Sequence, residues 1–287
     1  MTQQIKGEII PIEELQLPDI LYKYKCFDGN YHEKALFENE LYLPSANKFN
    51  DPFDSKIPFR YPEEDLTEEN IQKKTFLIAQ EMAPDLSKIQ HEEMAIRMQK
   101  ENLLNESHHL EQVDKATFKR LCSDFGILSL TPNEKNILMW SYYSNSHKGF
   151  CIGYNAKYLI QSRIFGSGGM VAYSNDFPKM PLFPTRDDNA ILNLLFTKGK
   201  VWEHEEEYRL IHRYKNSNTR ILPTEAISEV ILGCQIPEQD RVNYALKIQG
   251  VLPNVEIFQI EQSKTNFSLE KIPVLDKAHS IDFKKKS

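Results

Sequence analysis

The sequence predicts an α+β fold, in which short strands form a mixed sheet core and one helical segment is inserted. Short apolar runs bounded by Pro, Gly and Asn recur along the chain, without a regular alternation of strand and helix. Between about 62 and 120 the composition shifts to Glu, Gln and Lys, with apolar residues at helical spacing. The 287 residues, 40% of them hydrophobic, suffice for one large core, so we expect a single domain over 1–287.

Before the inserted segment we expect a strand at 21–25, a helix at 31–38 and a strand at 41–43 that Pro44 ends. A turn-rich stretch follows at 47–54. Its Asn and Asp residues before a proline favour an Asx turn that holds Phe49 and Phe53 in the core.

The inserted segment at about 62–120 is expected to contain two or three amphipathic helices, broken near Pro84-Asp85. After it, the apolar runs predict further strands at 126–130, 150–154, 170–173, 208–214, 229–232 and 255–260. A glycine turn is expected at 166–169, and helices are expected at 187–200 and 237–248.

Composition narrows the class of protein. The net charge of −6 argues against broad binding to nucleic acid, which requires a basic face. No signal peptide is visible, and no apolar run reaches the ~20 residues that span a bilayer. Four scattered cysteines fit a reducing environment. We therefore expect a cytoplasmic protein that does not bind membranes.

The sequence lacks the motifs of several common classes of enzyme. Glycine-rich nucleotide loops, the His-Glu-x-x-His zinc motif and the Gly-x-Ser-x-Gly nucleophile motif do not occur. His108-His109 is the one adjacent histidine pair, and it lies in the polar helical segment, where a solvated helix face explains it. No metal is expected.

The first candidate ligand site is the strand that carries Tyr22, Lys23 and Tyr24. In an extended chain the two tyrosines share one face and Lys23 lies on the other. Stacking and positive charge could together hold an aromatic, phosphate-bearing ligand. An edge strand guarded by lysines is the alternative.

The second candidate ligand site combines a helical turn with the loop that follows it. Trp140, Ser141 and Tyr143 lie on the turn, and His147 and Lys148 lie in the loop before a glycine. This concentration of polar-tipped side chains would line a pocket well. A buried aromatic cluster beside an exposed loop is the alternative.

The catalytic candidates are Glu205, Glu207 and Arg209, in an acidic stretch that begins after Trp202. In an extended chain these three side chains and Glu203 would share one face. A carboxylate among them would stabilise positive charge or bind a sugar hydroxyl, and Arg209 would orient it. An exposed helix with a Glu205–Arg209 pair is the alternative.

Four ordered motifs resemble a widespread bacterial family known as domain of unknown function 2971. They are Leu-Tyr-Lys-Tyr near the start, Asn-Asp-Pro-Phe-Asp, Met-Trp-Ser-x-Tyr followed by His-Lys-Gly-Phe-Cys-Ile, and Trp-x-x-Glu-x-Glu-x-Arg. The resemblance covers roughly residues 20 to 235 and implies no established activity.

The order of these parts is also similar to that of the ADP-ribosyltransferase fold. In that fold a first strand anchors NAD, a middle strand supplies Ser, Thr or Tyr, and a late strand carries the catalytic Glu. By order, the positions fall at Lys23 or Tyr24, at 141–143, and at Glu205 or Glu207. No His or Arg occupies the first strand here, so Lys23 would supply the positive charge.

The leading hypothesis is transfer of ADP-ribose from NAD, as substrate, to an unknown macromolecular acceptor. A bacterial toxin or anti-phage defence effector with a neutralising partner protein would use such an activity. One alternative is a metal-dependent nuclease or phosphodiesterase, with Mg²⁺ held by Asp51, Asp54, Glu205 and Glu207 and a phosphate held by Lys148. The other is a non-catalytic protein that senses a ligand or binds a partner.

Overall fold

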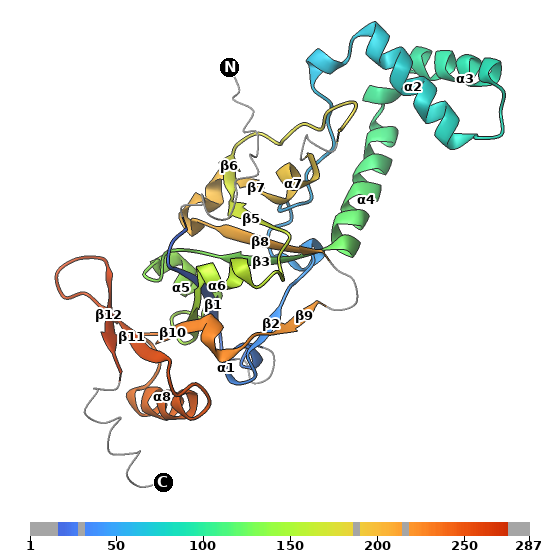
Figure 1. Cartoon of the computed structure of the whole chain (residues 1–287). Helices are drawn as coiled ribbons and strands as arrows, with labels where there is room; N and C mark the ends of the chain where they lie inside the picture. The colour runs from blue at the N-terminus through green and yellow to red at the C-terminus, as the bar shows by residue number, and fades with distance from the viewer. Residues whose placement is uncertain (1–16, 28–31, 186–189, 214–217, 275–287) are drawn as a thin grey trace. The chain divides into compact units, whose positions relative to one another are not determined.

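The computed structural model describes residues 17–27, 32–185, 190–213 and 218–274, and its mixture of helices and short strands confirms the α+β class (Figure 1). The strands are β1 (Ile20–Lys25), β2 (Glu40–Tyr42), β3 (Phe125–Leu130), β4 (Phe150–Asn155), β5 (Ser167–Met170), β6 (Ala172–Ser174), β7 (Thr197–Gly199), β8 (Tyr208–Arg213), β9 (Thr219–Ile221), β10 (Ile227–Leu232), β11 (Glu256–Gln262) and β12 (Leu269–Pro273).

The α-helices are α1 (Lys34–Phe37), α2 (Glu68–Met82), α3 (Lys88–Lys100), α4 (Ser107–Asp124), α5 (Ile137–Tyr143), α6 (Ala156–Gln161), α7 (Ala190–Leu195) and α8 (Glu238–Val251). Short 3₁₀ helices are η1 (Ala46–Lys48), η2 (Glu63–Asp65), η3 (Leu103–Asn105), η4 (Lys200–Glu205) and η5 (Thr224–Ala226). Among the described residues, no helix has the length and apolar character needed to cross a membrane.

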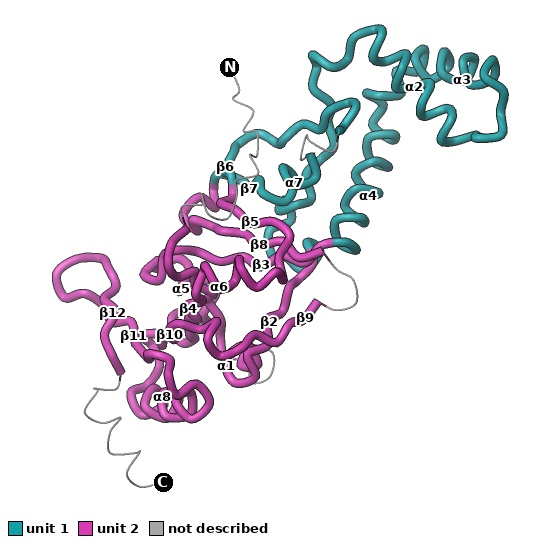
Figure 2. Tube along the Cα trace, in the orientation of Figure 1, with its two compact units in different colours: residues 1–9, 46–124, 172–200 teal, residues 10–45, 125–171, 201–287 magenta. Residues whose placement is uncertain are grey.

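The chain divides into two compact units (Figure 2). Unit 1 contains 46–124 and 172–200, and the described part of unit 2 lies within 17–45, 125–171 and 201–274. The expected single domain over 1–287 stays a prediction.

Unit 2 contains the largest sheet, in the order β1-β4-β10-β11-β12. All of its neighbouring strands are antiparallel except β10 and β11, which are parallel. The run Phe150–Tyr154 of β4 is buried throughout, as expected for a central strand covered on both faces. A second sheet of unit 2 has the order β3-β8-β5, and it positions the acidic stretch.

Unit 1 contains the predicted helical segment. Its helices α2, α3 and α4 follow one another with short breaks, and the break between α2 and α3 includes the predicted Pro84-Asp85. Thr67 and Ser87 cap the N-termini of α2 and α3, and Ser87 forms a full capping box with Gln90. The segment extends to Asp124, slightly beyond the predicted end.

Three local predictions were wrong. The expected glycine turn at 166–169 is largely strand β5, because its glycines allow close pairing with β8: a methyl group at Gly168 would lie 2.5 Å from Leu210 Cδ2. The expected helix at 187–200 ends earlier than predicted. Within its described part, helix α7 ends at Leu195 and strand β7 follows at Thr197–Gly199. Phe53 is 60% exposed instead of buried.

Candidate functional site

The acidic stretch is neither the extended strand nor the exposed helix considered from the sequence. It forms η4 up to Glu205, turns at Glu206, whose φ of 47° is left-handed, and then enters β8. The turn places Glu205 and Glu207 in buried positions, each 3% exposed, although both are acidic. A non-glycine residue at positive φ costs roughly 1–2 kcal/mol, so the remaining contacts must hold this turn.

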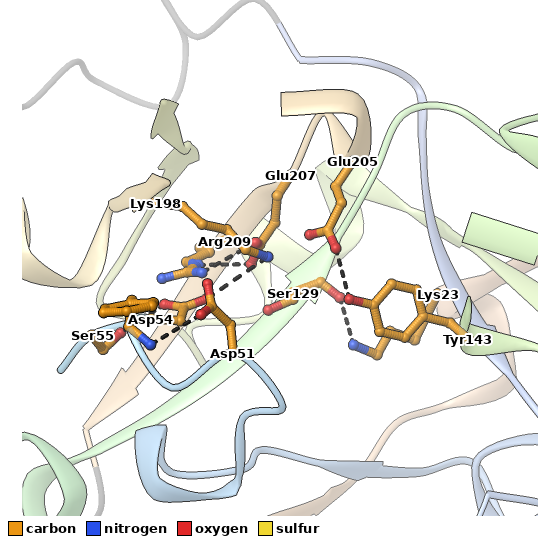
Figure 3. A network of polar contacts seen from close by, with 11 residues as sticks. Lys23, Asp51, Asp54, Ser55, Ser129, Tyr143, Lys198, Glu205, Glu207 and Arg209 are labelled. Atoms are coloured by element: carbon orange, nitrogen blue, oxygen red, sulfur yellow. Dashed lines mark hydrogen bonds and ion pairs between the residues drawn. The ribbon is translucent and has the colours of Figure 1, made fainter. Parts of the chain in front are cut away.

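Glu207 forms a buried ion pair with Arg209, which is fully buried on β8 (Figure 3). Arg209 Nε lies 2.6 Å from Glu207 Oε1, and Arg209 Nη2 lies 3.1 Å from Oε2. Both carboxylate oxygens therefore accept hydrogen bonds from one guanidinium, a geometry that only arginine provides. Arg209 faces Ser129 of β3 and Gly169 of β5 in the ladder, so the pair is fixed at the centre of its sheet.

Glu205 has a different partner. The Tyr143 hydroxyl, at the end of α5, donates a 2.6 Å hydrogen bond to Glu205 Oε1. Helix α5 begins at the Asn136 cap, whose side-chain oxygen accepts from two backbone amides and whose amide donates to the backbone oxygen of His204. Asn133 donates a 3.0 Å hydrogen bond to Glu206 Oε1. The turn before α5 thus holds the backbone of the acidic stretch.

Lys23 links β1, a strand of the five-stranded sheet, to the β3-β8-β5 sheet. Its Nζ donates a 2.8 Å hydrogen bond to the backbone oxygen of Ser129, the residue opposite Arg209 (Figure 3). The early Tyr/Lys strand, the aromatic segment near 140 and the acidic stretch therefore meet within unit 2.

Tyr22, Tyr24 and Trp140, for which ligand contacts are predicted from the sequence, are buried side chains. Their exposed fractions are 6%, 4% and 0%. Tyr24 donates to the backbone oxygen of Asn133 at 2.6 Å, and its ring meets that of Trp140 edge-on, with centroids 5.1 Å apart. Burial raises the pKa of both tyrosine hydroxyls, and Glu229 adds to the shift at Tyr22. These aromatic side chains belong to the hydrophobic core beneath the site.

His147 and Lys148 lie in a tightly wound loop after α5, and Ser141 lies on α5 itself. Three consecutive residues, 145–147, have positive φ, and Ser141 Oγ lies 3.0 Å from His147 Nε2. A methyl group at Gly233 would lie 2.1 Å from the His147 carbonyl oxygen, so the loop packs directly on backbone. Burial lowers the pKa of His147. Lys148 is exposed. Among the described residues, no hydrogen bond joins this loop to Glu205 or Glu207.

The Asn-Asp-Pro-Phe-Asp turn lies in unit 1. Asp51 Oδ1 accepts from the backbone amide of Phe53 at 3.0 Å, which is the predicted Asx turn. Asp54 accepts from Ser55 at 3.1 Å and lies 3.7 Å from Lys198 Nζ, in a pair that is almost fully buried (Figure 3). In the described part of the chain, no three His, Cys, Asp or Glu side chains are grouped to hold a metal ion.

The sequence predictions missed three contributors to these networks. They are Lys198, the Asn133/Asn136 turn and the partly buried Glu229–Lys271 pair, in which Lys271 Nζ lies 2.8 and 3.1 Å from the two Glu229 oxygens. The asparagines stand before an apolar helix and after Thr-Pro, which is a recognisable cap signal. The lysines carry no local signal, because their partners are distant in sequence.

Residues 139–210 match the family model described as protein of unknown function (DUF2971), so the resemblance to that family is confirmed over this segment. The matched segment includes Tyr143, Glu205, Glu207 and Arg209. No curated protein matches the chain, and no solved structure does.

Proposed function

We propose that this protein transfers ADP-ribose from NAD to a macromolecular acceptor, with Glu205 as the carboxylate that acts on the ribose. The observation that carries the proposal is that two neighbouring buried glutamates have different partners. Arg209 donates hydrogen bonds to both oxygens of Glu207, and the Tyr143 hydroxyl donates to Glu205 Oε1. Because the guanidinium of Arg209 holds the Glu207 carboxylate at both oxygens, we assign the ribose contact to Glu205.

A buried carboxylate suits this reaction. When the bond between the ribose carbon and the nicotinamide nitrogen breaks, its electron pair leaves with nicotinamide and the ribose becomes positively charged. A nucleophile of the acceptor then forms the new bond and releases its proton. A carboxylate that accepts a hydrogen bond from a ribose hydroxyl stabilises that charge more in the transition state than in the ground state.

The other residues have positioning and binding roles in this proposal. Tyr143 fixes the rotamer of Glu205, and the Glu207–Arg209 pair fixes the start of β8. Lys23 supplies positive charge toward the pyrophosphate in place of the His or Arg of the similar fold. NAD is the substrate, and no metal takes part.

The experiment is incubation of the purified chain with NAD labelled in its adenylate half, together with cell extract as a source of acceptor. We expect release of nicotinamide and transfer of label to a macromolecule. Glu205→Gln should abolish both, and Glu256→Gln, which removes an exposed charge of β11 in the same unit, should retain them. A folded wild-type protein without turnover would contradict the proposal, and loss of activity with chelator would favour metal-dependent hydrolysis.

We further propose that the activity belongs to a toxin or defence effector of the cytoplasm, held in check by a neutralising protein. No disulfide joins the four cysteines, which supports a reducing compartment. Expression of the wild-type chain should slow bacterial growth, and expression of the Glu205→Gln variant should not. Equal toxicity of the two would instead support a non-catalytic, ligand-sensing protein.

A further inference from the structure

Three ring side chains of unit 2 meet beside Glu205, and we call them the ring cluster: Tyr142 of α5, and Trp202 and His204 of η4. The Tyr142 and His204 ring centroids lie 6.3 Å apart with 62° between the planes, and those of Trp202 and His204 lie 6.1 Å apart at 35°. Side chains three apart eclipse in a 3₁₀ helix, which aligns Trp202 with Glu205. Tyr142 is 61% exposed, a large fraction for an aromatic side chain.

His204 has a buried ring nitrogen to which no residue in the described ranges is hydrogen-bonded. Its Nδ1 lies 3.2 Å from the backbone oxygen of Val201, which can only accept, so Nδ1 carries the proton. In the neutral ring, Nε2 is then an acceptor with a lone pair. This Nε2 is buried and has no hydrogen-bond partner among the described residues. Buried polar atoms almost always have partners, so an orphaned acceptor inside an aromatic cluster indicates a ligand that donates a hydrogen bond.

The charges around the ring cluster select among ring-shaped ligands. Glu203 and Glu206 are exposed on the same stretch, and Glu205 is buried within it. Aromatic faces attract cations, and a dense group of carboxylates adds to the attraction. A planar ring that carries both a positive charge and an N–H donor matches this environment better than a neutral base.

We infer that the ring cluster binds the nicotinamide end of NAD, with the cationic ring against Tyr142 and Trp202 and the carboxamide N–H donating to His204 Nε2. The inference deepens the function proposed above and rests on it. It assigns ring recognition to exposed and half-buried side chains next to Glu205, in place of the core residues Tyr24 and Trp140. Because Nε2 is buried, entry requires a neighbouring ring to move, and exposed side chains such as Tyr142 change rotamer within nanoseconds.

The test uses 1-methylnicotinamide as a minimal cationic ring and tryptophan fluorescence as the signal. The chain has two tryptophans, and Trp140 is fully buried, so quenching on contact reports Trp202. We expect saturable quenching that Trp202→Phe removes. Tyr142→Ala should weaken binding about ten-fold and Tyr142→Phe should preserve it, because the ring and not the hydroxyl makes the contact. Phe267→Ala, which removes a fully exposed ring of the β11–β12 turn, is the matched control.

A second variant isolates the hydrogen bond. His204→Asn keeps an N–H that can donate to Val201 and removes Nε2, so it should weaken binding of 1-methylnicotinamide about ten-fold without lowering the melting temperature. A lower melting temperature with unchanged affinity would assign His204 a structural role and overturn this part of the inference.

Two outcomes separate this inference from the proposed function. If NAD is turned over but 1-methylnicotinamide quenches linearly and equally in Tyr142→Ala, the ring cluster does not bind the ring and the inference fails alone. If 1-methylnicotinamide binds saturably but NAD is not turned over, the ring site stands and the transferase proposal fails. Saturable binding of adenosine monophosphate that displaces 1-methylnicotinamide would show an adenine site and overturn the nicotinamide assignment.

Discussion

The Tyr22 hydroxyl donates a 2.9 Å hydrogen bond to Glu229, two strands away in the same sheet. The intervening position on β4 is Gly153, which is opposite both residues in the ladder. With no side chain there, the tyrosine reaches across the strand. Lys271 of β12 completes the network by pairing with both oxygens of Glu229. One glycine thus permits a buried polar link from β1 to β10, and the lysine extends it to β12.

Gly153→Ala should break this link. A methyl group at Gly153 would lie 2.8 Å from Glu229 Cγ, 2.8 Å from Ile20 Cγ2 and 3.0 Å from Tyr22 Cε1, and all three neighbours are constrained. We expect the free energy of unfolding to fall by about 1–3 kcal/mol, measured by urea denaturation.

The control for this substitution is Gly250→Ala in helix α8. A methyl group there meets nothing within 4 Å, and alanine is the better helix former, so stability should rise by about 0.5–1 kcal/mol. Equal effects of the two substitutions would refute the crowding argument at Gly153.

The buried tyrosines predict a loss of stability at alkaline pH, and Tyr24 provides a specific test. Burial raises the pKa of the folded-state hydroxyl, whereas the unfolded-state hydroxyl ionises near pH ~10. The stability from this group is therefore complete below the unfolded-state pKa and declines above it, by about 1.4 kcal/mol per pH unit.

Tyr24→Phe gives the measurable difference. At pH 8 it should cost about 1 kcal/mol, because the hydrogen bond to the Asn133 carbonyl is lost. Above pH ~10 the difference between wild type and variant should shrink and then reverse, since phenylalanine does not ionise. A pH-independent difference in the free energy of unfolding between pH 8 and 11 would contradict this assignment.

Removal of the Glu207 charge should destabilise the protein more than removal of a surface charge. Glu207→Gln removes the negative charge from the ion pair with the fully buried Arg209, which should cost about 3–5 kcal/mol. Glu203→Gln, at an exposed position, should change stability by less than about 0.5 kcal/mol.

A paired replacement distinguishes the lost ion pair from lost packing. Glu207→Leu combined with Arg209→Met removes both charges and keeps apolar volume, so it should recover part of the loss in denaturation experiments. If the double variant is less stable than Glu207→Gln, the cost lies in packing and not in a buried charge.

The left-handed turn at Glu206 should tolerate glycine and reject β-branched residues. Glu206→Gly relieves the backbone cost of a φ of 47° and loses one exposed hydrogen bond from Asn133, so we expect a change in melting temperature close to zero or upward. Glu206→Val should lower stability by at least about 1 kcal/mol, since the branched side chain resists this conformation. Equal melting temperatures of the two variants would show that the turn relaxes.

Local sequence patterns were sufficient for most of the elements. Apolar runs such as 126–130 and 150–154 became β3 and β4, and the caps at Thr67 and Ser87 explain why α2 and α3 begin where they do. The patterns failed at 166–169, where glycines that look like a turn instead permit close strand pairing. They failed again at Phe53, whose exposure no local pattern encodes.

In the candidate site, too, local sequence patterns predicted part of the arrangement and tertiary packing decided the rest. The sequence by itself identified Glu205, Glu207 and Arg209 as an acidic group with a cation, because charge and spacing are local properties. Only the tertiary structure decided that Arg209 pairs with Glu207 and that Tyr143 pairs with Glu205. The physical reason is that a 3₁₀ helix and a left-handed turn redirect each side chain. Which distant group then lies within hydrogen-bonding distance depends on how the strands pack, and no sequence period records that.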